Sequence, residues 1–167
     1  MEDIRFLIDR HFFTYRVGAV IIEDDYLLMV KNTSVDYYYS VGGAVQHMET
    51  AQEAVRREVL EETGVDYEVD RLLFIHENIF NNANDTPMLK DRDCHEIALY
   101  FLMKPQGSRD VVCKSVGMDG AKESLHWLPV GELGEYVMYP KFFCDRILDL
   151  PLAVEYVCTD RVQPKFT

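Results

Sequence analysis

Residues 43–65 read GAVQHMETAQEAVRREVLEETGV, and this stretch decides the fold. From residue 50 to residue 63 it contains no glycine or proline and many good helix formers, so it predicts a helix. Thr50 is a suitable N-cap, and Glu53, three residues later, completes a capping box. Gly64 provides the C-terminal stop. We therefore expect one helix with both of its ends marked in the sequence.

The predicted helix carries acidic side chains on its apolar side. Successive residues advance about 100° around a helix, so Glu58 and Glu62 fall in the sector of Ala51 and Val55, which should face inward. A solvated helix face held by salt bridges is the common alternative, but its glutamates belong opposite the apolar stripe. Carboxylates gathered at a partly buried edge repel one another unless a cation joins them. Hard oxygen ligands of this kind suit Mg²⁺ or Mn²⁺, so the pattern favours a metal site.

Extended segments flank the predicted helix on both sides. Before it, residues 13–22 and 26–30 are rich in β-branched and aromatic side chains and predict a hairpin around a polar turn. Residues 37–41 predict a third strand, which we expect the following glycine pair to stop. After the helix we expect strands at 65–80, 95–103 and 124–128, loops at 81–93 and 105–123, and helices at 129–136 and 141–150. This order indicates an α+β or mixed α/β sandwich.

Length, charge and cysteine content narrow the class of protein. The 167 residues fit one domain spanning 1–167, large enough to bury its own core. The chain has 29 acidic and 17 basic residues, a formal charge of −12 that disfavours binding to nucleic acid polymers. No apolar run approaches the roughly 20 residues that cross a bilayer, and the N-terminus lacks a signal-peptide pattern. With four cysteines and no CxxC pair, we expect reduced thiols in a cytoplasmic protein without membrane contact.

The spacing of glycine, glutamate and arginine within residues 43–65 is the most specific signal in the chain. It runs Gly43, five residues, Glu49, seven residues, Arg57-Glu58-Val59, one residue, Glu61-Glu62, one residue, Gly64-Val65. This spacing resembles the Nudix hydrolase signature GX5EX7REUXEEXGU, in which U is aliphatic, at every specified position. A chance match somewhere in such a chain is expected on the order of once in ten million, from average residue frequencies.

The resemblance implies both a fold and a reaction. The fold would be an α/β/α sandwich around a mixed β-sheet, in which this motif, the Nudix box, forms a loop, a helix and a second loop. The reaction would be hydrolysis of a nucleoside diphosphate linked to another group. By position, Glu58 and Glu62 would bind the metal, Glu61 would bind it directly or through water, and the carbonyl of Gly42 would often join them.

The same resemblance implies a supporting role for two further box residues. Arg57 and Glu49 would form an ion pair that orients Glu58. The sequence departs from the family pattern at Val41, where proline is frequent, and at Met48, where glycine is frequent. Both departures concern the shape of the loop before the helix and leave the ligand set complete.

Hydrolysis of a phosphoanhydride also needs charge neutralisation and a base that takes a proton from water. The resemblance leaves the base open, because family members use either a box glutamate, here Glu61 or Glu62, or an acid on a distant loop. Outside the box, Glu96 at the start of its strand is one candidate, with a strand-edge charge as the alternative. The loop acids are further candidates, with turn formation as the alternative: Asp85, Asp91 and Asp93.

The substrate and the oligomeric state stay open at this point. Downstream marks of the ADP-ribose, dinucleoside polyphosphate and NADH subgroups are absent, and Phe80 lies near the first two of these positions. A nucleoside triphosphate or a nucleotide sugar therefore remains open as the substrate. The rival functions are a Nudix-like module that binds a nucleotide without cleaving it and a hydrolase of a non-nucleotide diphosphate. A homodimer is also open, with an interface that includes the aromatic N-terminal segment around Phe6, Phe12 and Phe13.

Overall fold

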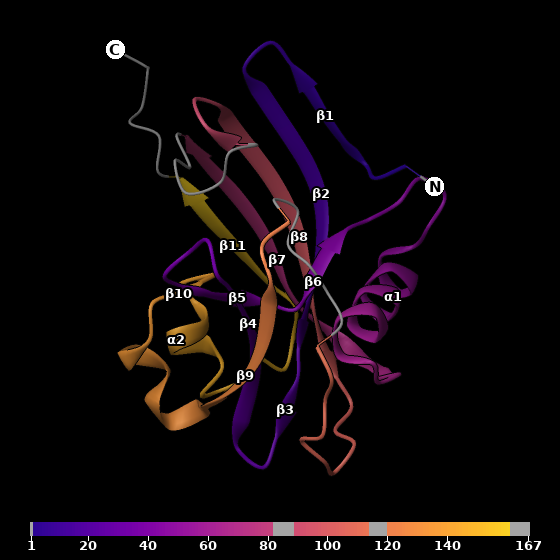
Figure 1. The fold of residues 1–167 in the computed structure, drawn as a ribbon, viewed down its shortest axis with the longest axis vertical. Helices are drawn as coiled ribbons and strands as arrows, with labels where there is room; N and C mark the ends of the chain where they lie inside the picture. The colour runs from indigo at the N-terminus through magenta and orange to yellow at the C-terminus, as the bar shows by residue number, and fades with distance from the viewer. Residues whose placement is uncertain (1, 82–88, 114–119, 161–167) are drawn as a thin grey trace.

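The computed structural model describes residues 2–81, 89–113 and 120–160, which form two β-sheets and three helical segments (Figure 1). Candidate base Asp85 lies outside the described residues. Within the described part of the chain, no helix is long and apolar enough to span a bilayer.

The larger sheet has six strands and mixed polarity. Its order is β1 (Arg5–Ile8), β2 (His11–Val20), β8 (Asp93–Met103), β7 (Val69–Asn81) and β11 (Glu155–Asp160), with β6 (Gly42–Ala44) also paired to β2. The β2–β8 and β7–β11 pairs are parallel, and the remaining pairs are antiparallel. Parallel pairing between strands so distant in the chain brings the first and second halves of the sequence together.

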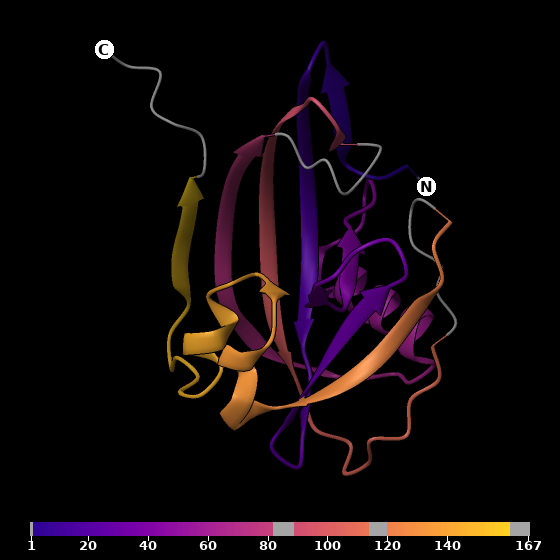
Figure 2. The same cartoon turned by 60° about the vertical axis from the view of Figure 1, so that its left-hand side comes forward.

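The smaller sheet has five strands and diverges from the larger one (Figure 2). Its order is β10 (Met138–Tyr139), β5 (Tyr38–Ser40), β4 (Tyr26–Asn32) and β3 (Ile22–Glu23), with β9 (Glu123–Pro129) paired to the other edge of β4. The helical segments are α1 (Ala51–Thr63), the 3₁₀ helix η2 (Val130–Glu135) and α2 (Phe143–Arg146).

Helix α1 forms where the sequence predicts it, with both predicted ends. The Thr50 side chain accepts a hydrogen bond from the Glu53 amide, and the Glu53 carboxylate accepts one from the Thr50 amide, which completes the capping box. At the other end, Gly64 adopts a left-handed conformation with φ 72° and donates its N–H to the Leu60 carbonyl.

Two hydrophobic clusters bury opposite faces of the larger sheet. On one face, Val55 and Val59 of α1 belong to the same cluster as Val17, with Leu99 packed against it. On the other face, Phe143 of α2 packs near the rings of Phe74 and Tyr100, at centroid distances of 6.3 and 5.1 Å. Helices therefore cover both faces of a mixed sheet, which confirms the predicted α+β class.

The structure corrects three details of the predicted elements. The glycine pair does not end the strand region but forms β6, because Gly42 runs so close to β2 that a Cβ there would lie 2.2 Å from the Val17 carbonyl oxygen. The helix predicted at 141–150 is limited to Phe143–Arg146. The edge strands β1 and β11 lie outside the predicted set.

Candidate active site

The candidate site lies where α1 meets both sheets. The loop after β6 leads directly into α1, so the box residues stand beside β2. Strands β2 and β8 of the larger sheet contribute Arg16 and Glu96, and β5 and β9 of the smaller sheet contribute Tyr39 and Glu123. The site therefore combines segments that are up to about 100 residues apart in the chain, from Arg16 to Glu123.

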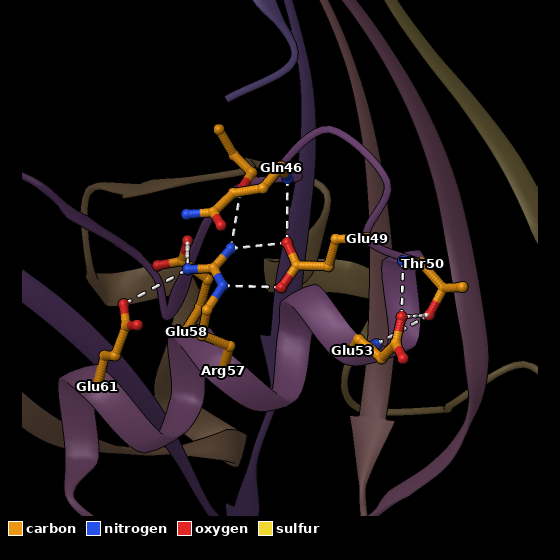
Figure 3. A network of polar contacts seen from close by, with 8 residues as sticks. Gln46, Glu49, Thr50, Glu53, Arg57, Glu58 and Glu61 are labelled. Carbon is orange, nitrogen blue, oxygen red and sulfur yellow. Dashed lines mark hydrogen bonds and ion pairs between the residues drawn. The ribbon is translucent and has the colours of Figure 1, made fainter. Parts of the chain in front are cut away.

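Arg57 is the centre of a network that holds the loop and the helix together (Figure 3). Its Nε and Nη2 donate to the two carboxylate oxygens of Glu49, at 2.8 and 3.0 Å. Nη2 also donates to the Ala44 carbonyl at 3.1 Å, and Nη1 donates to Glu58 at 2.7 Å and to Glu61 at 3.4 Å. This bidentate contact with Glu49 is the strong form of an arginine–carboxylate pair.

The network fixes the charge state of Glu49. The hydrogen bonds from Arg57 lower the pKa of the Glu49 carboxyl, and the Gln46 amide, which donates to Glu49 at 3.0 Å, adds to this effect. Glu49 is almost fully buried, with 9% of its side chain exposed. Glu49 and Arg57 thus form the expected ion pair, and Arg57 also donates a hydrogen bond to Glu58.

Glu58 packs against a residue that has no side chain. A Cβ at Gly43 would lie 2.5 Å from the carboxyl carbon and both carboxylate oxygens of Glu58. Burial raises the pKa of Glu58, and the hydrogen bond from Arg57 opposes that rise. Gly43 therefore makes room for a partly buried carboxylate.

The buried carboxylate of Glu62 has a hydrogen-bond donor for only one of its two oxygens. The Gly42 N–H donates to its Oε1 at 3.3 Å, whereas its Oε2 is buried and has no hydrogen-bond partner. Burial, followed by the neighbouring carboxylates of Glu123 and Glu58, raises the pKa of Glu62 well above its ordinary value. A buried carboxylate oxygen without a donor is costly, and a bound cation would remove that cost.

Glu61 lies on the flank of this group. Its side chain is 59% exposed, and its carboxylate contacts Arg57. Among the residues that the structure describes, no three His, Cys, Asp or Glu side chains are grouped closely enough to hold a metal ion. The reason is local: Arg57 draws Glu58 and Glu61 toward itself, while Glu62 contacts Gly42.

The candidate bases outside the box differ in their surroundings. Glu96 is 12% exposed and accepts a hydrogen bond from Arg16 at 3.3 Å. Burial opposes the charged form of Arg16, but Glu96, together with Tyr100 and Glu62, raises its pKa above the ordinary value. Asp93 pairs with Arg10 at 2.9 Å, and Asp91 is exposed at a turn with φ 58°. Glu96 is therefore the only one of these three that lies near the box glutamates.

Sequence reasoning missed Glu123 as a member of the site. The Tyr39 hydroxyl donates to the Glu123 carboxylate at 2.7 Å, and burial followed by this hydrogen bond raises the pKa of Tyr39. After burial, the charge of Glu123 does most to raise the pKa of Glu62. The one available signal was an acid at the end of the loop predicted at 105–123, next to the predicted strand, and many surface residues share that position. Only the pairing of β4 with β9 brings Glu123 to the box.

The chain belongs to the Nudix family of hydrolases: the family's NUDIX domain model matches residues 13–143. It is therefore an enzyme of the pyrophosphohydrolase class, whose members generally use divalent metal ions. Among curated proteins, the chain is similar to a MutT-like protein of Streptomyces ambofaciens, with 27% identity over 132 residues. That alignment covers 79% of this chain and 72% of the relative.

Solved structures of the family share the fold at low sequence identity. The MutT protein of Methanosarcina mazei Go1 matches with a TM-score of 0.59 and 19% identity, over 82% of this chain and 91% of its own. A MutT protein of Bacillus halodurans matches with a TM-score of 0.59 and 17% identity, over 89% and 91%. An ADP-ribose pyrophosphatase of Streptococcus suis matches with a TM-score of 0.54 and 15% identity, over 87% and 98%.

Proposed function

We propose that this Nudix hydrolase cleaves the phosphoanhydride bond of a nucleoside diphosphate linked to another group, with Mg²⁺ as its cofactor and Mn²⁺ as a substitute. The observation that carries the proposal is the buried Oε2 of Glu62, which lacks a partner beside Glu58 and Glu123. Such a set of carboxylates is suited to a hard divalent cation. The intact box around it supports hydrolysis as the reaction.

The box glutamates supply the oxygen donors that a divalent metal ion needs, although in the described part of the chain no three of them are grouped closely enough to hold one. Glu58 and Glu62 would be its direct ligands, Glu61 would bind directly or through water, and the Gly42 carbonyl would complete the set. Glu123, whose charge raises the pKa of Glu62 and which accepts a hydrogen bond from Tyr39, is a further acid beside these ligands. When bound, a divalent ion neutralises negative charge on the diphosphate oxygens.

Positioning of Glu58 and acceptance of the proton from water are the other two roles, and both belong to side chains of this protein. Arg57 and Glu49 orient Glu58 through the bidentate contact and the 2.7 Å hydrogen bond. Two carboxylates besides Glu62 could accept the proton from water: exposed Glu61 and Glu96, which Arg16 holds in place. Replacing each with glutamine identifies the base, since loss of the base removes the dependence of kcat on an acidic ionisation.

Membership of the family supports a small nucleotide derivative as the substrate. Nucleoside triphosphates and nucleotide sugars, which the sequence leaves open, are the first compounds to test. ADP-ribose joins them because one structure that shares the fold is named an ADP-ribose pyrophosphatase. The formal charge of −12 supports a small substrate that arrives with its cation and argues against nucleic acid polymers. We further propose a single domain over residues 1–167 and a cytoplasmic location, supported by four free cysteines.

The test compares Glu62→Gln with Glu53→Gln in the presence of Mg²⁺ and a panel of nucleotide and non-nucleotide diphosphates. Removal of a group that stabilises transition-state charge is expected to lower kcat about 10²–10³-fold. Glu53 lies on the exposed side of α1 and serves only the helix cap, so its variant should keep full turnover. Unchanged turnover in Glu62→Gln would refute the assignment, and tight binding without product would support the nucleotide-sensing alternative.

A further inference from the structure

Glu23 is the most buried acidic residue in the described part of the chain, and no step of the proposed reaction uses it. It lies in β3, and 2% of its surface is exposed. The amides of Gln106 and Gly107 donate to its two carboxylate oxygens, the second of them at 2.9 Å. Gly107 has a φ of 74°, which residues with a side chain rarely adopt. The buried carboxylate therefore holds one particular turn of the chain in place.

A third partner of Glu23 comes from the segment that follows α1. Tyr67 is fully buried, and burial, the charge of Glu23 and a hydrogen bond to that carboxylate raise the pKa of Tyr67 to about 12. Tyr67 lies four residues after Thr63, the last residue of α1. Glu23 thus ties the smaller sheet to the C-terminal end of α1.

The segment that Glu23 holds also connects α1 with β9. We call residues 104–112 the strap. The Val112 amide donates to the Thr63 carbonyl at the end of α1, at 2.9 Å. The indole N–H of Trp127, in β9, donates to the Arg109 carbonyl at 3.0 Å. The strap therefore links the helix of the box to a strand of the smaller sheet.

The strap is fastened to the β3–β4 hairpin as well. The Arg109 guanidinium lies 4.3 Å from the centre of the Tyr26 ring, and its Nε lies 3.9 Å from the Asp24 carboxylate. The strap and the hairpin lie side by side at the same end of the molecule (Figures 1 and 2). Glu23 and Arg109 thus hold the strap to one hairpin from its two partner strands.

Each end of the link between α1 and β9 leads to an acid of the candidate site. Thr63 follows Glu62 directly in α1. Trp127 lies four residues after Glu123 in β9, and side chains four residues apart in a strand share a face. Glu62 is carried by a helix on the larger sheet and Glu123 by a strand of the smaller one. The separation of these two acids therefore depends on what joins α1 to β9.

We propose that Glu23 is a positioning residue for the reaction: by holding the strap, it keeps Glu62 and Glu123 together where the proposed cation binds. The inference rests on the proposed function. Glu23 acts only through the strap, because its carboxylate is occupied by two amides and Tyr67.

The first test measures the electrostatic coupling between the two acids, without metal or substrate. Because their charges repel, Glu62→Gln should raise Tm at pH 7 less in a chain that already carries Glu123→Gln. This difference should fall by about half or more in the Glu23→Ala background, where the strap is released. The same difference in both backgrounds, or none in the native chain, would overturn the proposal.

The matched control is Ile147→Ala, since Ile147 is 2% exposed in the hydrophobic cluster around α2. Its truncation destabilises the fold while the strap stays in place, so the coupling should persist. An equal loss of coupling in this background would overturn the proposal as a general effect of lower stability. If Glu23→Ala does not fold, Trp127→Phe decides, because it removes the indole N–H, keeps an aromatic ring and should also reduce the coupling.

The single tryptophan of the chain reports the state of the strap directly. Its fluorescence should shift to longer wavelength in Glu23→Ala, because the indole N–H loses the Arg109 carbonyl and meets water. Ile147→Ala should keep the native emission. An unshifted emission in Glu23→Ala would mean that the strap stays bound without Glu23, which overturns the proposal.

The second test measures Mg²⁺ binding by calorimetry. Loss of a residue that orients metal ligands generally lowers metal affinity about 10- to 100-fold, so Glu23→Ala should raise the Mg²⁺ dissociation constant by that factor, and Ile147→Ala should not change it. Equal constants in the native chain and Glu23→Ala would overturn the positioning role. A native chain that binds no Mg²⁺ would instead refute the proposed function, and the metal-free coupling would still decide whether Glu23 holds the two acids together.

Discussion

At the residue scale, two adjacent glycines have different neighbours and therefore different functions. Gly42 has a positive φ of 141° and lies against the backbone of β2, whereas Gly43 lies against the carboxylate of Glu58. A side chain at the first position would meet a rigid carbonyl group. At the second position it would meet the far end of a flexible side chain.

Alanine substitutions should therefore separate stability from activity at these two positions. Gly42→Ala is expected to lower the free energy of unfolding by more than about 2 kcal/mol, because of backbone strain and the contact with the Val17 carbonyl. Gly43→Ala should change it by less than about 1 kcal/mol but displace Glu58, reducing kcat/KM about 10- to 100-fold. Urea denaturation and steady-state kinetics measure the two quantities. The separation would be contradicted if both variants lost the same amount of kcat/KM and the same free energy of unfolding.

At the element scale, α1 depends on its capping box as well as on its apolar side. The helix has Val55 and Val59 buried in the core, but its first turn is held by the reciprocal hydrogen bonds between Thr50 and Glu53. The loop that precedes it is held by Arg57 and Glu49. The position of the acidic residues thus depends on both ends of one loop–helix segment.

Removing the cap should destabilise the protein without removing the site. Thr50→Ala is expected to cost about 1 kcal/mol, which corresponds to a decrease in Tm of about 2–4 °C for a protein of this size. Gln52→Ala, at an exposed position of the same turn, should leave Tm nearly unchanged because alanine is a good helix former. Calorimetry of both variants checks this expectation, and equal Tm values for the two would contradict it.

At the scale of the whole molecule, the site joins the two sheets. Glu62 of α1 faces Glu123 of the smaller sheet, and Arg16 of the larger sheet lies close enough to influence both Glu62 and Glu58. Repulsion between these carboxylates lowers the stability of the metal-free protein at neutral pH. A cation bound between the sheets would convert that repulsion into attraction.

Mg²⁺ should therefore stabilise the whole fold. At a concentration 100 times its Kd, a ligand that binds only the folded state adds about 2.7 kcal/mol, so Tm should rise by about 5–10 °C. EDTA should reverse the rise, Glu62→Gln should abolish it, and Glu53→Gln should retain it. Differential scanning calorimetry with and without Mg²⁺ gives these values.

Glu62→Gln should also change how the Tm of the metal-free protein depends on pH. Because the folded-state pKa of Glu62 is raised, its ionisation disfavours folding, and the loss begins as pH rises above the ordinary value of 4.5. Glu62→Gln should therefore raise Tm at pH 7 and have little effect below pH 4.5. A lower Tm at pH 7 would show that Glu62 already has a favourable partner in the metal-free protein.

Local pattern was sufficient to predict the helix, its caps, most strands of the sheets and the residues of the box. Thr50, Glu53 and Gly64 act within one helix, so their effects are readable from sequence. The contact between Arg57 and Glu49 spans only one loop and one helical turn, and the resemblance to the Nudix signature predicted it. By contrast, β1 and β11 are edge strands whose pairing depends on partners far along the chain.

The sequence by itself determined α1, the order of the acidic residues on it and the family to which the chain belongs, because these depend on short-range hydrogen bonds and on spacing. Only the tertiary structure decided that Glu123 and Tyr39 reach Glu62 and that Arg16 holds Glu96. Those contacts depend on how separate strands pair and how the two sheets meet, and the energies of burial and charge repulsion that give them their effect exist only after the chain has folded.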